Sequence, residues 1–306
     1  MRLSRFEFQR RSMHSIKLRY KSAARSAVRR AARVIGATLP LSVRKALLSA
    51  GIFKGPRAGF EFTMGMLDDL RCSDPDGLHR FLWSNHLAYA ASYEVKERFG
   101  VSKLNPSRRV LFADMVAHLR SRGLDPRINI RSAFDVGCSM GYLLRHLEVD
   151  VCPAAEILHG IDIDAYAVEA GMVHLRCLQS KVKLFAADMS DTERIMGGRT
   201  YDLMLCCGVL MYVSEAAAYQ VVRTMLSRAN YLVGIICLAA EQKSGAHSRQ
   251  SVVRSADGAF THDVDRMIRR AGGRVVSSKW IGTDVSRSSP SYAILAEPRH
   301  VRSIVH

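Results

Sequence analysis

The feature that most constrains this fold is an apolar strand that ends in an acid and turns through glycines directly into a helix. The stretch is AFDVGCSMGYLLRHL, residues 133–147. Gly137 permits a sharp turn and the close approach of a ligand to the backbone, and Gly141 permits close packing where the helix begins. Because parallel α/β sheets bind ligands at the carboxyl ends of their strands, this stretch predicts a nucleotide-like ligand at the turn.

Short apolar runs alternate with helical segments from residue 131 onward, which predicts an α/β, doubly wound, mostly parallel sheet. No helix fits between the last two runs, so we expect them to pair antiparallel at the sheet edge. The predicted strands are Ala133–Val136, Ile157–Ile161, Val182–Phe185, Tyr201–Cys206, Tyr231–Leu238, Arg274–Trp280 and Tyr292–Ala296. The predicted helices are Tyr142–Val149, Ala165–Leu178, Thr192–Met196, Glu215–Arg228 and Asp263–Ala271.

Two helices are predicted ahead of the sheet, after a stretch of helix breakers. Residues 38–59 contain prolines and glycines typical of a linker or of short helices. Leu78–Phe99 predicts one helix rich in aromatic residues. Asn105 and Pro106 form the N-cap and first turn of the next helix, which ends at Gly123.

Basic residues are concentrated at the N-terminus. The whole chain has a formal net charge of +17, and residues 1–57 hold 11 Arg and 4 Lys against one acid, Glu7. The periodicity of Ile16–Ile35 predicts a helix with a basic face beside a mostly alanine face, which favours weak contact with an anionic membrane surface. A nucleic acid, an acidic partner or a solvated tail are the alternatives. The apolar face comprises Ile16, Tyr20, Ala24, Ala27, Ala31 and Ile35.

Cysteine usage and hydropathy bear on the compartment. Seven cysteines form no CxxC pair, so we expect neither a disulfide framework nor a metal site, and this favours a reducing compartment. No apolar run reaches the ~18–20 residues of a membrane span, and the N-terminus lacks the apolar core of a secretory signal. We expect a cytoplasmic protein with possible peripheral membrane contact, and an Arg- and Ser-rich transit peptide is the alternative.

Acids stand at or near the carboxyl ends of three successive predicted strands. Asp135 suits a cationic ammonium group and argues against a pyrophosphate, and the GxGxxG pattern of dinucleotide sites is absent. Asp162 suits the two hydroxyls of a ribose, while Asp164 suits the cap of the following helix. Asp188 suits an adenine amino group. Each acid alone also fits a structural role as a turn or cap residue, but the three together predict one ligand site.

The segments DVGCSMG, GIDID, AADM and YDLMLCCGVLMYV resemble the motifs of the class I S-adenosylmethionine-dependent methyltransferases, over about residues 133–237. The resemblance implies S-adenosylmethionine as the cofactor and a seven-stranded sheet whose last strand is antiparallel. It assigns the methionyl part to Asp135 and Gly137, the ribose to Asp162, and the adenine to Asp188 with Met189 as an apolar neighbour. The expected cofactor-binding residues are Asp135, Gly137, Ser139, Gly141, Asp162, Asp188, Met189 and Cys207.

The resemblance also divides the chain. We expect a basic, partly helical arm at residues 1–57, a helical cap or lid at 58–130, a methyltransferase domain at 131–298 and a tail at 299–306. Ser139 stands where the family often has glycine. The loop after the fourth strand lacks the Asn/Asp-Pro-Pro-aromatic segment, which argues against methylation of exocyclic amines of nucleic acids.

Methyl transfer is a direct displacement at a sulfonium, and the protein must align the acceptor and often remove a proton. We expect acceptor contacts from Tyr89, Tyr93, Tyr212 and Arg254. His262 and His247 are the candidate bases, because a neutral imidazole is available near pH 7. The structural alternatives are a helix-start position for His262, a solvated charge for Arg254, and core packing for Tyr89 and Tyr93.

The function predicted from these residues is O-methylation of a small-molecule, glycan or lipid-linked acceptor. An RNA methyltransferase that uses the arm for phosphate contacts is the first alternative, although residues 58–306 carry 30 basic and 27 acidic side chains and no recognisable RNA module. The second alternative is a cofactor-binding protein without catalysis. The oligomeric state is left open.

Overall fold

The computed structural model describes residues 24–50, 58–88, 95–99, 104–238, 251–286 and 289–299. The chain divides into two compact units, one formed by Met1–Ser73 with Leu87–Ser92 and the other by Asp74–His86 with Tyr93–His306. Across the described residues, no helix is both long enough and apolar enough to cross a membrane.

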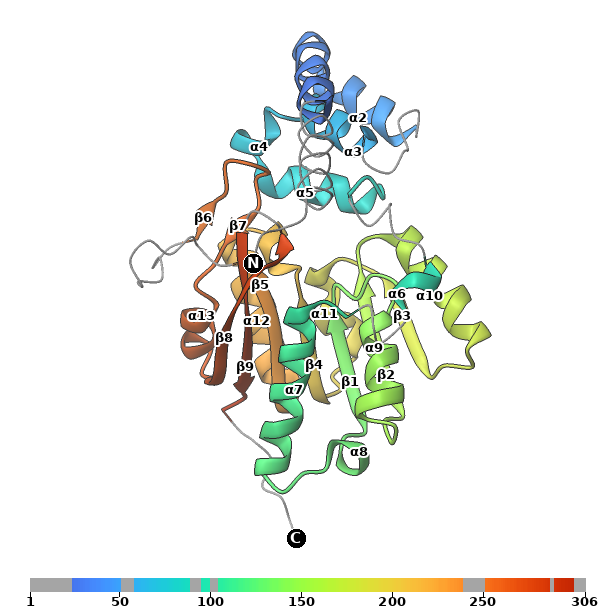
Figure 1. The fold of residues 1–306 in the computed structure, drawn as a ribbon, viewed down its shortest axis with the longest axis vertical. Helices are drawn as coiled ribbons and strands as arrows, with labels where there is room; N and C mark the ends of the chain where they lie inside the picture. Colours follow the sequence, from blue (N-terminus) through green and yellow to red (C-terminus); the bar gives the residue numbers. More distant parts are fainter. Residues whose placement is uncertain are drawn as a thin grey trace, which may run out of the picture. The chain divides into compact units, whose positions relative to one another are not determined.

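A seven-stranded sheet forms the centre of the second unit (Figure 1), in the order β3-β2-β1-β4-β5-β9-β8. Its strands are β1 (Ser132–Val136), β2 (Ile157–Asp162), β3 (Val182–Ala186), β4 (Tyr201–Cys207), β5 (Ala229–Leu238), β8 (Arg274–Ser286) and β9 (Ser289–Glu297). Strands β1 to β5 pair in parallel, and β9 is antiparallel to both of its neighbours. The predicted fold class is confirmed, including the antiparallel last strand, which lies between β5 and β8.

Helices cover both faces of this sheet. The helices are α7 (Pro106–Ser121), α8 (Pro126–Asn129), α9 (Tyr142–His146), α10 (Ala165–Cys177), α11 (Thr192–Met196), α12 (Glu215–Arg228) and α13 (Val264–Arg270), with a π-helical turn at Leu147–Val151. Side chains of α7, α9 and α10 share one core cluster, and those of α11, α12 and α13 share the other. Successive residues of β4 alternate between the clusters, as the period of a strand requires, so β4 is buried on both faces.

The helix predicted at Leu78–Phe99 is wrong as one continuous element. Instead, α5 (Pro75–Ser84) is capped by Asp74, and a short helix, α6 (Val95–Arg98), follows later. The break has a local cause. The Asn85 side chain donates to the Phe81 carbonyl at 2.9 Å, and His86 takes a left-handed φ of 54° that no helix tolerates. By contrast, the cap predicted at Asn105 is confirmed, since its side chain accepts from the Arg108 backbone N–H.

The first unit contains helix 24–38 and the helices α2 (Leu41–Ser49), α3 (Ala58–Met66) and α4 (Leu70–Ser73). Helix 24–38 packs closely on α3, because a Cβ added at Gly36 would lie 2.7 Å from the Met66 carbonyl oxygen. One added at Gly65 would lie 2.7 Å from the Ala32 methyl group. Only the smallest residues allow this contact, so the buried face of the helix holds Ala32 and Gly36.

The apolar face predicted for this helix is therefore not the one that packs. Ala24, Ala27, Ala31 and Ile35 are exposed, and Ile16 and Tyr20 lie outside the described residues. Part of the basic charge is neutralised within the unit. Asp68 pairs with Arg29, Arg33 and Arg71, and the buried Arg44 pairs with Asp69 at 2.6 Å and donates to the Met66 carbonyl. This section of the arm is thus a folded element.

A glycine in α10 fixes how closely that helix approaches the turn after β1. A Cβ added at Gly171 would lie 2.3 Å from the Met140 carbonyl oxygen. We expect Gly171→Ala to lower the free energy of unfolding by about 1–3 kcal/mol through overpacking, although alanine otherwise favours a helix by about 1 kcal/mol. Urea unfolding measures the difference.

Val173→Ala is the matched control, since Val173 lies on the same helix and is 54% exposed. Its effect should stay within about 0.5 kcal/mol. A Gly171→Ala protein as stable as the parent would show that the turn shifts to accommodate the added methyl group with no loss in the free energy of unfolding.

Candidate functional site

The turn after β1 has a backbone that only glycine and a few other residues tolerate. Gly137 has φ 77° and Gly141 has φ 81°, and Ser139 between them has φ 50°. A Cβ added at Gly137 would lie 2.2 Å from the Val209 side chain. The backbone N–H groups of Gly137 and Cys138 both donate to the Ile161 carbonyl, at 2.8 and 2.9 Å. The turn is therefore held against the end of β2.

Asp135 is a buried acid without a hydrogen-bond partner. It lies on β1 and is 1% exposed, and neither carboxylate oxygen has a hydrogen bond. Burial raises the pKa of this carboxyl to about 8; the positive charge of Arg108 opposes the rise and the negative charge of Asp162 adds to it. An acid in this state suits a cationic ligand, because an ammonium group supplies both the charge and the hydrogen bonds that are missing.

Asp162 closes the turn from the end of β2. Its Oδ2 accepts from the Ser139 N–H at 2.7 Å, and its Oδ1 accepts from the Asp164 N–H at 2.9 Å. Burial raises its pKa to about 6, against the lowering effect of these backbone hydrogen bonds. Each oxygen keeps a second lone pair, which suits a ribose hydroxyl. Asp164 caps α10, as predicted, by accepting from the Ala167 N–H at 3.0 Å.

Asp188 lies at the same end of the sheet, just after β3. Its Oδ1 accepts from the backbone and the hydroxyl of Ser190, and its Oδ2 pairs with Arg80 at 2.7 Å. Met189 follows and packs against the core cluster that contains Phe134. The three predicted acids thus end three adjacent parallel strands, β1, β2 and β3.

Helix α5 contacts the loops after β3 and β4, and His86, which follows the helix, contacts the loop after β2; the sequence did not indicate this. His86 Nδ1 lies 2.6 Å from Asp164 Oδ2, and Arg80 pairs with Asp188. The rings of His79 and Trp83 lie 4.9 and 5.0 Å from the ring of Tyr212. His79 and Trp83 have i, i+4 spacing on α5, which is the signal that could have revealed their common face.

Arg108 is a second residue that sequence reasoning missed. It lies on α7, and its Nη2 donates to the Cys207 carbonyl at 3.4 Å. Its guanidinium lies 5.6 Å from the centroid of the Tyr142 ring, and that of Arg98 lies 5.8 Å from it. Cys207, the last residue of β4, is buried, and burial raises the pKa of its thiol. A positive charge therefore lies at the end of β4, and it opposes the rise in the pKa of Asp135.

His262 is satisfied by its own chain. Its Nε2 lies 2.9 Å from the Leu210 carbonyl and 3.1 Å from the Val213 carbonyl, and its Nδ1 lies 2.7 Å from the Ser251 hydroxyl. Burial lowers its pKa. Both ring nitrogens are thus engaged in fixing the loop after β4. This geometry favours a positioning role, and catalysis by His262 stays a prediction.

Of the other predicted acceptor and base residues, the structure describes only Arg254 and Tyr212. Arg254 forms an ion pair with Asp257 in the connection between the short strands β6 (Val252–Val253) and β7 (Phe260–Thr261). Tyr212 lies in the 3-10 turn η5 (Leu210–Tyr212), against α5. Tyr89, Tyr93 and His247 lie outside the described residues.

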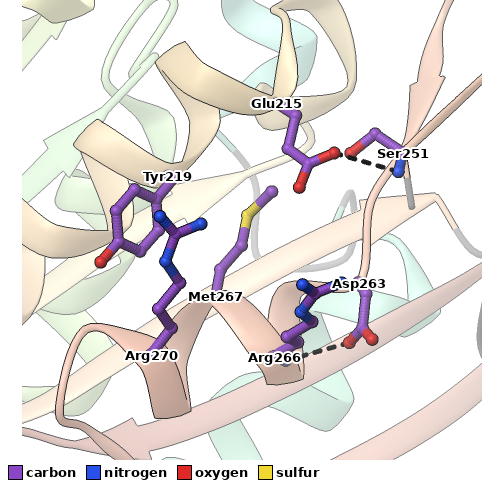
Figure 2. A pocket seen from close by; sticks show the side chains of 7 residues that line it. All are labelled: Glu215, Tyr219, Ser251, Asp263, Arg266, Met267 and Arg270. Carbon is purple, nitrogen blue, oxygen red and sulfur yellow. Dashed lines mark hydrogen bonds between the residues drawn. The ribbon is translucent and has the colours of Figure 1, made fainter. Parts of the chain in front are cut away.

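Figure 2 shows a small pocket elsewhere in this unit, between α12 and α13. The Ser251 N–H donates to Glu215 at 3.2 Å, and the Arg270 guanidinium lies 4.5 Å from the centroid of the Tyr219 ring. Its lining is Glu215, Tyr219, Ser251, Asp263, Arg266, Met267 and Arg270. None of the predicted cofactor residues lines it.

Solved structures that match the chain include magnesium protoporphyrin IX methyltransferase from Synechocystis PCC 6803 with bound SAH, at 16% identity and a TM-score of 0.49, covering 73% of this chain and 99% of that one. An O-methyltransferase from a trans-AT PKS multienzyme of Brevibacillus brevis matches at 13% identity with a TM-score of 0.44, and the match covers 65% of this chain and 81% of that one. The 1,6-didemethyltoxoflavin-N1-methyltransferase of Burkholderia thailandensis matches at 14% identity with a TM-score of 0.48, and the match covers 65% of this chain and 81% of that one.

No curated protein matches the sequence. Residues 133–229 match the family called Methyltransferase domain. The matched segment begins within β1 and includes the glycine turn, Asp135, Asp162 and Asp188. On this match and this arrangement, residues 133–229 form a methyltransferase domain of the class I S-adenosylmethionine-dependent type.

Proposed function

We propose that this enzyme binds S-adenosylmethionine along the carboxyl ends of β1, β2 and β3 and methylates a hydroxyl group of a small-molecule, glycan or lipid-linked acceptor. The observation that carries the cofactor assignment is the buried carboxyl of Asp135, which has no partner. The cofactor has an ammonium group that suits this acid, and it supplies a methyl group activated on a sulfonium.

The surrounding residues have complementary tasks in this proposal. Asp162 binds the ribose hydroxyls through its remaining lone pairs. Asp188 and Met189 hold the adenine, the first by a hydrogen bond and the second by apolar contact. Arg108 faces the methionyl carboxylate, because its guanidinium lies beside Asp135 and carries the charge that a carboxylate needs.

The acceptor assignment rests on charge and on loop composition. Residues 58–306 have a net charge of only +3, which gives the methyltransferase unit no strongly basic surface for RNA. The segment after β4, GVLMYV, lacks the prolines typical of amine-methylating enzymes of nucleic acids. These features support a small or lipid-linked hydroxyl acceptor over an RNA.

The ribose assignment predicts that Asp162→Ala weakens cofactor binding. Losing charge-assisted hydrogen bonds worth about 1.5–3 kcal/mol raises the Kd for S-adenosylmethionine roughly 10- to 100-fold. Calorimetric titration measures the Kd. Glu156→Ala, which removes an exposed acid just before β2, is the control and should leave the Kd unchanged. Equal affinity of Asp162→Ala and the parent would refute the ribose assignment.

Cofactor affinity should also depend on pH through Asp135. Since its pKa is about 8 in the free protein, the carboxyl is mostly protonated at pH 7 and must release a proton to bind an ammonium. The Kd should therefore fall as pH rises from 6 to 7.5, by up to about tenfold per unit. Titrations in two buffers of different ionisation enthalpy measure the proton release.

Asp135→Asn cannot release that proton, so its weaker binding should lose both the pH dependence and the buffer dependence. In the folded protein without cofactor, the raised pKa means that stability falls as pH rises from about 4 to about 8. The asparagine variant should lack the decline between about pH 6 and 8, while Asp162, whose pKa is raised to about 6, still contributes a decline at lower pH. A parent protein that binds with no net proton release would contradict the assignment of the ammonium group to Asp135.

We propose further that the first unit contacts an anionic membrane surface. Val34 is 68% exposed, and Ile35 on the same helix and Val43 on α2 are also exposed. The exposed Arg25 and Arg30 lie on helix 24–38 as well. Exposed apolar side chains next to cationic ones suit an interface of anionic headgroups and acyl chains.

Replacing Val34 and Ile35 together by Glu should weaken binding to vesicles that contain phosphatidylserine. Each side chain contributes about 1.5–3 kcal/mol when fully buried, so we expect a loss of at least roughly tenfold in a vesicle sedimentation assay. Val173→Glu on α10 is the control. Unchanged vesicle binding would contradict the proposal, and a steep salt-dependent affinity for RNA would favour the RNA alternative.

A further inference from the structure

His79 has an unpartnered ring nitrogen in the interior. It lies on α5 and is 4% exposed, and its Nε2 has no hydrogen-bond partner. Burial, the largest influence, lowers the pKa of the ring, and the backbone of Gly258 opposes this. A neutral imidazole protonated on Nδ1 keeps on Nε2 the lone pair that a general base needs.

The surroundings of His79 belong to the loop after β4. The His79 ring lies 4.9 Å from the ring of Tyr212, and Trp83, one turn further along α5, lies 5.0 Å from the same ring. In the proposed function, the residues after Cys207 border the methyl end of the cofactor. An acceptor that enters beside this loop therefore meets the aromatic surface of the three rings.

We propose that His79 is the general base of methyl transfer and that His79, Trp83 and Tyr212 form the acceptor site for an aromatic or similarly flat hydroxyl compound. This inference rests on the proposed methyltransferase function. In the step, a lone pair of the acceptor oxygen forms the bond to the methyl carbon. The sulfur–carbon bond breaks, its electrons remain on sulfur as a neutral thioether, and the hydroxyl proton passes to Nε2.

Charged groups around His79 set its titration. Burial lowers the pKa of the ring; Asp257 in the β6–β7 connection and Asp76 on α5 oppose this, while Arg254 adds to it. The net direction is below the ordinary value of 6.5. The base is therefore neutral and ready at pH 7. At saturating cofactor, the rate should rise with pH to a plateau whose midpoint lies below 6.5.

Since the acceptor is unidentified, the test follows label from methyl-labelled S-adenosylmethionine into the small-molecule fraction of a cell extract. We expect His79→Asn to lower the initial rate at least about 100-fold, with the Kd for the cofactor within twofold of the parent. Its rate should keep rising with pH above 8, because hydroxide replaces the lost base. Added imidazole should restore activity to His79→Ala in proportion to the neutral imidazole present.

His118→Asn is the control, because His118 lies on α7 and pairs with Glu297 at 2.8 Å. It should keep the parental rate and pH profile. If both His79 variants fail to fold, the pH profile of the parent still decides. The inference is overturned if the rate of the parent reaches no plateau, or reaches one whose midpoint lies at or above pH 6.5.

A folded His79→Asn with the parental rate and profile overturns only the assignment of the base. His79 is purely structural if His79→Ala is slow, is not restored by imidazole and keeps the pH dependence of the parental rate. This result also overturns the assignment of the base. A parent that binds cofactor but labels no fraction contradicts the proposed function itself.

Discussion

A carboxyl group without a partner inside the sheet is the constraint on which the rest of the site depends. An ionised carboxylate in a low-dielectric interior costs several kcal/mol when nothing compensates it. In the free protein, Asp135 avoids this cost by holding a proton, as its pKa of about 8 shows. A cationic ligand offers the other solution, since its charge makes the ionised form favourable. The proposed site is thus complete only with a cation beside Asp135, and a ligand of this kind would account for a buried acid that has no hydrogen-bond partner in its own chain.

The same acid needs a rigid frame, because an electrostatic contact is specific only when its geometry is fixed. Asp162 supplies part of that frame by holding the Ser139 N–H at 2.7 Å. Two glycines supply the rest by removing side chains where backbones meet. A Cβ at Gly160 would lie 2.7 Å from that of Cys138, and one at Gly171 would meet the Met140 backbone. A preformed turn loses little conformational entropy when the ligand binds, so more of the contact energy contributes to affinity.

Local patterns explain what could be predicted from the sequence. The strands are runs of apolar residues whose alternate side chains enter the two cores, and this period is visible within five residues. The acids were recognisable because each lies at or just beyond the carboxyl end of a strand. The break in the helix predicted at 78–99 was not, since a left-handed backbone at His86 has no reliable sequence signal. The contact that stabilises it joins His86 to Asp164, which is 78 residues away. Arg108 was missed for the same reason, because it reaches Cys207 across 99 residues.

The two histidines near the loop after β4 show why residue type alone does not assign chemistry. His262 lies in a polar connection whose composition is that expected of an acceptor site, yet carbonyls and a hydroxyl contact both of its ring nitrogens. His79 lies on an aromatic helix and has the pattern of a core residue, yet its Nε2 has no partner. A base acts through a lone pair, so the histidine that its own chain leaves incomplete is the one suited to take a proton. The same logic selects Asp135 for the cation, and incomplete hydrogen bonding in the interior therefore marks both ends of the proposed reaction site.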